Sequence, residues 1–238
     1  MSVLFQADKV SKVYGEGRLR TEALREVDLS IGVGEAVALM GPSGCGKSTL
    51  LGVLGLMIRP TSGRLLLRGV EVTGDERRRT RWRNEFFGYV HQDFAIINDE
   101  TVEQNVTIPL EYALPRVRRN ARRARAREAI SQVGLEWAAH KRASHLSQGE
   151  RQRVAIARSL VNEPDLVLAD EPTAALDSVT AQEIITLLLA VRQRGASVLL
   201  ATHDQRVANR CDRIVLIRDG YLLGDDASPE SELTVKRA

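Results

Sequence analysis

The chain has 238 residues, of which 43% are hydrophobic and 27% charged, and its net charge is +3. This composition is ordinary for a globular protein, and the length favours one domain with subdomains over two independent domains. Aromatic residues make up 4% of the chain, which argues against base-stacking platforms for single-stranded nucleic acid.

The amino-terminal part of the chain reads as β-rich, because short apolar segments are separated by turns that contain glycine. Helical patterns dominate from about residue 101 to 160, and strand–helix alternation then resumes. The predicted strands are residues 4–10, 24–31, 64–68, 87–91, 166–169 and 197–201, followed by a hairpin at 214–223. This order predicts an α/β domain with a mostly parallel sheet and an inserted helical subdomain.

A glycine-rich segment at residues 41–49, here called the phosphate loop, lies between the apolar run 36–40 and a predicted helix. It fits the pattern glycine, four residues, Gly-Lys-Ser/Thr in the strand–helix context which that pattern requires. Its backbone N–H groups can cradle phosphate, Lys47 can neutralise the terminal phosphates, and Ser48 can ligate Mg²⁺. The candidate nucleotide-binding residues are Gly41, Ser43, Gly44, Cys45, Gly46, Lys47, Ser48 and Thr49.

Polar residues follow two later strands. Asp170 and Glu171 end the apolar run 166–169, and ligands in α/β sheets lie at the carboxyl ends of strands. Asp170 therefore suits a Mg²⁺ partner, and Glu171 suits a base that polarises the attacking water. His203 follows the strand at 197–201, where a neutral imidazole can hydrogen-bond the γ-phosphate and the water. The combination predicts hydrolysis in addition to binding.

Residues 146–150, Leu-Ser-Gln-Gly-Glu, are here called the signature segment and directly precede a strong helical pattern. Ser147 and Gly149 can bind an anion at the start of that helix. With the phosphate loop, the Asp170–Glu171 strand and His203, this segment resembles the ATP-binding subunit of ABC transporters over nearly the whole chain. The resemblance implies a P-loop ATPase fold with an antiparallel β subdomain at the amino terminus.

The resemblance also implies roles for residues that carry no signal of their own. Gln92 matches the Q-loop glutamine, which touches Mg²⁺ and the attacking water; Asp177 matches the D-loop aspartate; and Tyr14 matches the aromatic residue that stacks on adenine. It implies one domain over residues 1–227, with a core and β subdomain at 1–92 and 161–227 and a helical subdomain at about 93–160. The polar residues 228–238 predict a flexible tail. Two positions depart from the family pattern, Gln148 in the signature segment and Ala174 in the D-loop.

Several stretches resemble the macrolide-exporter, lipoprotein-release and FtsE-like branch of the family, among them residues 23–27 and 105–110. The resemblance implies a head-to-tail homodimer with two ATP molecules and Mg²⁺ at its interface, driving an FtsX- or MacB-like permease that exports or extracts peptide, lipid, lipoprotein or drug. An FtsE-like switch that gates a partner without transport is the alternative. A soluble ATPase acting on nucleic acid is a more remote one, because the chain has a single phosphate loop, no extended heptads and no CxxC.

The expected location is the cytoplasmic face of the membrane. No apolar run approaches the roughly 18–20 residues that span a bilayer, no secretory signal is visible, and Cys45 and Cys211 form no metal-type pair. Arginines cluster at residues 77–83 and again at 116–127. Each cluster is either a solvated helix face or a surface that attracts anionic lipid headgroups; nucleic acid is a third alternative, with little else in its favour.

Overall fold

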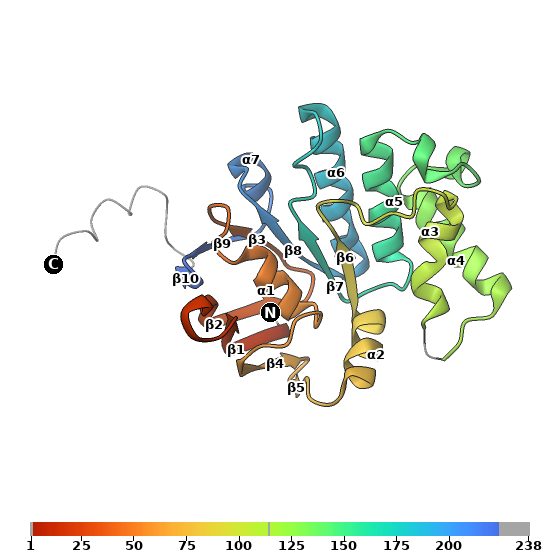
Figure 1. The fold of residues 1–238 in the computed structure, drawn as a ribbon. Coiled ribbons are helices and arrows are strands. Elements are labelled where there is room, and N and C mark those ends of the chain that lie inside the picture. Colours follow the sequence, from red (N-terminus) through yellow and green to blue (C-terminus); the bar gives the residue numbers. More distant parts are fainter. Residues whose placement is uncertain (1, 114, 224–238) are drawn as a thin grey trace.

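The computed structural model describes residues 2–113 and 115–223, so the predicted tail at 228–238 lies outside the described residues. Figure 1 shows two sheets with a group of helices set to one side. The first sheet has four strands in the order β2-β1-β4-β5 and is antiparallel. Its strands are β1 (Val3–Tyr14), β2 (Thr21–Gly32), β4 (Ser62–Leu67) and β5 (Val70–Glu71).

The second sheet has six strands in the order β10-β9-β3-β8-β7-β6. Its first five strands in chain order run parallel, and only β10 is antiparallel to its neighbour β9. The strands are β3 (Ala36–Met40), β6 (Phe87–Val90), β7 (Leu166–Asp170), β8 (Ser197–Thr202), β9 (Arg213–Arg218) and β10 (Tyr221–Leu223). The predicted α/β class with an antiparallel β subdomain is confirmed.

Strand β7 separates two hydrophobic cores. Its residues Leu166 and Leu168 pack with β1, β2 and the first helix, while Val167 and Ala169 pack with the helical group on the other face. All four are fully buried, as expected when successive side chains of a covered parallel strand point to opposite faces. The end of β7 is therefore fixed from both sides, which positions the carboxylates that follow.

Seven α-helices are found in the described part of the chain. Helices α3, α4 and α5 form the group at the right of Figure 1, and α6 lies beside α5. Among the described residues, no helix combines the length and hydropathy that crossing a membrane requires. The helices are α1 (Lys47–Leu54), α2 (Glu76–Phe86), α3 (Val102–Glu111), α4 (Arg119–Gln132), α5 (Gln148–Leu160), α6 (Ser178–Ala190) and α7 (Gln205–Ala208).

Helix α2 holds the first arginine cluster and was not predicted as an element. Arg79 is buried, and its guanidinium donates to the carbonyl oxygens of Leu56 at 2.9 Å and Ile58 at 3.3 Å. Arg83 also donates to Leu56, at 2.8 Å. These two arginines donate hydrogen bonds to carbonyl groups that have no partner within α1, because they follow its end. Part of this cluster is therefore structural, and only its other arginines are free to face solvent or lipid.

Candidate functional site

The phosphate loop joins β3 to α1, as the sequence predicts. Its conformation depends on glycine at two positions. Gly46 has φ 112°, and a Cβ there would lie 2.6 Å from the carbonyl oxygen of Ala23. A Cβ at Gly41 would clash with the carbonyl of Ile217. Side chains at these two positions would push the loop away from β2 and β9, so the loop keeps its curl only with glycine.

Lys47 starts α1 and is only 8% exposed. Its Nζ donates to the carbonyl oxygens of Gly41 at 2.7 Å and Pro42 at 3.0 Å, and lies 3.8 Å from Oε1 of Glu171. A buried ammonium is stable only with such partners. The cation is thereby held over the concave side of the loop, where the terminal phosphates of a nucleotide would exchange with these carbonyl groups.

Asp170 ends β7 and is 9% exposed, and its Oδ1 is buried without a hydrogen-bond partner. Burial raises the pKa of Asp170, and the nearby Ser48 hydroxyl and Lys47 ammonium oppose that shift. A hard cation such as Mg²⁺ prefers oxygen ligands, and a buried carboxylate oxygen without a hydrogen-bond partner lies here next to a hydroxyl oxygen. The residues present therefore fit a magnesium ion held by Ser48 and Asp170.

Glu171 and His203 meet at the carboxyl ends of the neighbouring strands β7 and β8. The Nδ1 atom of His203 lies 3.0 Å from both carboxylate oxygens of Glu171. Glu171 has φ 44°, an uncommon backbone conformation for a residue other than glycine, and its N–H donates to Ala201 at 3.0 Å. Its carboxylate is fixed between a lysine and a histidine, which is the arrangement of a positioned base.

A cavity of about 760 Å³ joins these groups. Eleven of the predicted residues line it: Ser43, Gly44, Cys45, Gly46, Lys47, Ser48, Thr49, Gln92, Asp170, Glu171 and His203. Gly41 contributes its carbonyl oxygen to Lys47 from the same loop.

Three predicted residues lie together elsewhere, around a second cavity of about 420 Å³ that Ser147, Gly149 and Asp177 line. Ser147 caps α5, accepting from Glu150 N–H at 3.3 Å. Asp177 caps α6, and its carboxylate accepts from the Thr180 hydroxyl at 2.6 Å, which lowers its pKa. The signature segment and Asp177 thus line one surface that is separate from the phosphate-loop cavity of the same chain, whereas Ala174 at the start of the D-loop lines the phosphate-loop cavity.

Tyr14 ends β1 and lines neither cavity. Its ring is 42% exposed, and Lys12 Nζ lies 5.0 Å from the ring centroid. The predicted stacking on adenine is neither supported nor contradicted by a contact, and it stays a prediction.

Sequence reasoning missed one wall of the first cavity, formed by the start of β2 and the turn between β9 and β10. Arg25 and Asp219 line this wall. The N–H of Gly220 donates to Cys45 in the phosphate loop at 3.1 Å, and Arg25 N–H donates to Gly220 at 2.9 Å. Only the pairing of distant strands brings these residues to the site, and no local pattern in the sequence signals that pairing.

A phosphate loop between a parallel strand and a helix, with carboxylates at the end of another parallel strand of the same sheet, defines a P-loop nucleoside triphosphatase. Residues 24–174 match the family model described as ABC transporter. The chain belongs to this family, and it is an ATP-binding ATPase of the ABC type.

Named relatives cover almost the whole chain. The lipoprotein-releasing system ATP-binding protein LolD 1 of Caulobacter vibrioides is 42% identical, over 96% of this chain and 98% of its own length. The macrolide export ATP-binding/permease protein MacB of Hyphomonas neptunium is 39% identical over 96% of this chain, but only 35% of MacB is covered. A dimeric structure of the ATP-binding cassette MJ0796 bound to ADP and Pi is similar, with a TM-score of 0.85 and 37% identity over 93% of this chain and 97% of that one.

Proposed function

We propose that this chain hydrolyses Mg²⁺-ATP in a head-to-tail dimer and thereby drives a separate membrane permease. The observation that supports this most is the division of the chemistry between two cavities of one chain. The phosphate-loop cavity holds Lys47, Asp170, Glu171 and His203, whereas Ser147 lies on the other surface. A second copy turned head to tail would bring its signature segment to the first copy's nucleotide.

The mechanism follows from the charges around the first cavity. Lys47 turns from its loop carbonyls to the β- and γ-phosphates, which offsets the charge that builds up during phosphoryl transfer. Glu171 accepts the proton of the attacking water, and His203 keeps the carboxylate oriented and hydrogen-bonds the γ-phosphate. Ser48, Asp170 and Gln92 would hold a magnesium ion, which would neutralise phosphate charge.

Closure of the dimer depends on the γ-phosphate, because ATP forms part of the interface between the two copies. The similar cassette MJ0796 has a dimeric structure, which supports a dimer of this chain. Gln92 follows β6 and lines the nucleotide cavity, at the start of the loop that leads to α3. It would therefore report the nucleotide state to the helical subdomain, where we place the permease.

The names of the relatives point to the type of partner. LolD 1 is named for lipoprotein release, and MacB combines ATP-binding and permease parts in one protein. By this similarity, the partner is an FtsX- or MacB-like permease, the cargo is lipoprotein, lipid, peptide or drug, and the chain works at the cytoplasmic face of the membrane.

The direct test of this function is ATP hydrolysis by the purified chain, alone and with its co-purified membrane partner. We expect Mg²⁺-dependent hydrolysis that the partner stimulates, and loss of nucleotide binding in Lys47→Ala, because the buried cation over the phosphate loop is removed. Arg192→Ala, which alters an ion pair with Asp212 on the surface, is the control and should keep ATPase activity. Hydrolysis that survives in Lys47→Ala would contradict the proposal.

We also propose that the second arginine cluster contacts anionic lipid next to the permease. Among the arginines of this cluster, all of which the structure describes, ion pairs are present only for Arg122, with Glu111, and Arg123, with Glu103. The exposed arginines without one are Arg116, Arg118, Arg119, Arg125 and Arg127. The first turn of α4 has no acidic residue, and Arg118 at its N-cap makes no capping hydrogen bond. Positive charge at the start of a helix is unfavourable, because it is repelled by the positive end of the helix dipole. An anionic headgroup bound there would reduce this repulsion.

Replacing Arg118, Arg119 and Arg127 together by Gln should weaken binding to vesicles that contain phosphatidylglycerol by roughly 100-fold, since each basic residue near an anionic surface contributes about 1 kcal/mol. Sedimentation with such vesicles, compared with pure phosphatidylcholine vesicles, measures the effect. Arg77→Gln with Arg78→Gln on α2 is the matched control and should bind as the wild type does. Equal binding to both kinds of vesicle, or preferential binding to nucleic acid, would contradict the lipid assignment.

A further inference from the structure

Helix α5 carries the signature segment at its start and a second feature near its end that the proposed mechanism does not use. Arg158 lies eleven residues after Ser147, which places the two about 16 Å apart along the helix. Its guanidinium donates to the carbonyl oxygen of Phe94 at 2.8 Å through Nη2, and to that of Ala95 through Nη1. One side chain therefore holds two consecutive carbonyl groups of the loop that begins with Gln92.

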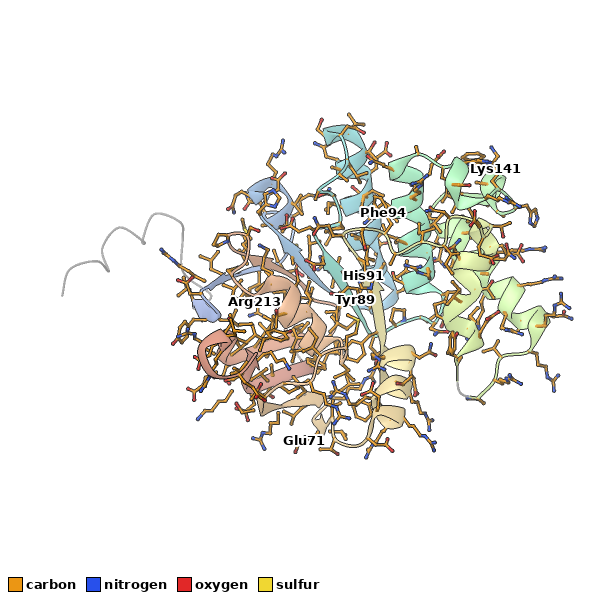
Figure 2. The ribbon with its side chains drawn as sticks, viewed as in Figure 1. Glu71, Tyr89, His91, Phe94, Lys141 and Arg213 are labelled. Atoms are coloured by element: carbon orange, nitrogen blue, oxygen red, sulfur yellow. The ribbon has the colours of Figure 1, made fainter. Side chains whose placement is uncertain are left out.

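That loop has an unusual conformation. Phe94 and Ala95 have φ values of 62° and 47°, and both therefore lie in the left-handed region that residues other than glycine seldom adopt. Such a backbone persists only where its surroundings hold it. Besides the guanidinium, its own turn contributes two hydrogen bonds, from Phe94 N–H to His91 at 3.2 Å and from Ala95 N–H to Asp93 at 2.7 Å. Figure 2 shows Phe94 beyond Tyr89 and His91, next to α5.

The charges around Arg158 agree with a fixed position. Burial lowers the pKa of its guanidinium, and the carboxylate of Asp93 opposes that shift. His91 lies against the ring of Tyr89, with 4.3 Å between ring centroids. Burial lowers the pKa of His91, and the positive charge of Arg158 lowers it further. The planar guanidinium presents its two Nη groups to the two consecutive carbonyl oxygens at once, and this geometry fixes its orientation.

We propose that Arg158 is a positioning residue which makes the Gln92 loop and the signature helix move together. The inference rests on the proposed dimer. When Gln92 engages bound Mg²⁺-ATP in its own cavity, the strained turn at residues 94–95 is displaced, and Arg158 transmits that displacement along α5 to Ser147. The signature segment that faces the partner's nucleotide is then set by the nucleotide bound in the same chain, so the two ATP sites of the dimer act cooperatively.

The test uses the full chain and measures ATP turnover against ATP concentration. Arg158→Ala should lower kcat by at least ~10-fold and bring the Hill coefficient close to 1, while the dissociation constant of ATP changes little, because the phosphate loop is untouched. Arg158→Lys, which keeps the charge but cannot donate to both carbonyl groups in one plane, should give an intermediate result. Adding Ala95→Gly to Arg158→Lys should restore part of the cooperativity, since glycine adopts the turn without strain.

Arg192→Ala is the matched control, because Arg192 also donates to a backbone carbonyl, that of Gly34 at 2.9 Å, but at the opposite end of β3 from the phosphate loop. It should lower the melting temperature without changing kcat or the Hill coefficient. Wild-type cooperativity in both Arg158 variants would overturn this inference alone. If the wild-type chain itself shows no hydrolysis, the proposed function fails instead. If Arg158→Ala does not fold, the inference is tested with Arg158→Lys and with Arg158→Lys combined with Ala95→Gly.

Discussion

Replacing Glu171 by Gln should lower ATP turnover by roughly 10²–10⁴-fold, the usual contribution of a general base, while ATP still binds. The amide has the shape of the carboxylate but cannot take a proton from water. It also removes the negative charge 3.8 Å from Lys47, so the lysine is freer to pair with phosphate. The substituted chain should therefore bind ATP at least as tightly and accumulate as closed dimers.

Steady-state hydrolysis and gel filtration with Mg²⁺-ATP measure these two effects. Glu85→Gln is a suitable control, since Glu85 is an exposed carboxylate on α2 that pairs with Arg81 at 3.5 Å, away from the nucleotide cavity. An unchanged rate in Glu171→Gln would remove Glu171 from the role of base. A lost rate with no ATP-dependent dimer would keep the base but contradict the closed, nucleotide-bridged state.

Two inactive variants should restore activity when they are mixed. Lys47→Ala destroys the phosphate site of its own chain and keeps an intact signature segment. Ser147→Arg keeps the phosphate site and places positive charge at the start of α5, where it opposes the dipole and fills the second cavity. In a mixed dimer one complete site remains, and half of the dimers in an equimolar mixture are mixed. About a quarter of the wild-type rate is therefore the upper limit of the regained activity, and cooperativity between the two sites should keep the observed rate below it.

The measurement is the ATPase rate of each variant alone and of the mixture, over a range of protein concentrations. Ser147→Ala serves as the control for the lost helix cap, whose removal alone costs roughly 1 kcal/mol of stability. Ser147→Arg should still bind ATP, because its own phosphate loop is unchanged. No gain of activity on mixing would contradict the idea that each nucleotide is shared between two chains.

The parts of the site that could be predicted are those in which neighbours in sequence are also neighbours in space. The phosphate loop lies between the predicted strand and helix, and Lys47 starts α1, because the curl of the loop depends on its own glycines. Asp170 and Glu171 follow a strand whose apolar run is read directly from the sequence. Their closeness to His203 was also predictable, because parallel strands bring their carboxyl ends to one edge of the sheet.

Other features depend on contacts between distant segments. The strands β1 and β2 extend well beyond the predicted 4–10 and 24–31, because their ends pair with each other through polar residues that give no apolar signal. Helix α2 was read only as an arginine cluster, since the carbonyl group of Leu56 that Arg79 satisfies lies 23 residues earlier. The role of Asp177 as the N-cap of α6 was also not predicted. An aspartate suits both an N-cap and the D-loop position, and the resemblance indicated only the D-loop role.

The hydrogen bonds of Gly220 have a consequence for biosynthesis. This residue joins Arg25 and Cys45, which are synthesised early, to the turn between β9 and β10, which is synthesised much later. A nascent polypeptide can form the antiparallel sheet early, but its nucleotide pocket stays without one wall until translation has passed the β9–β10 hairpin. Ribosome-bound chains that end before residue 218 should then gain no protection from protease when ATP is added, whereas released full-length chains should.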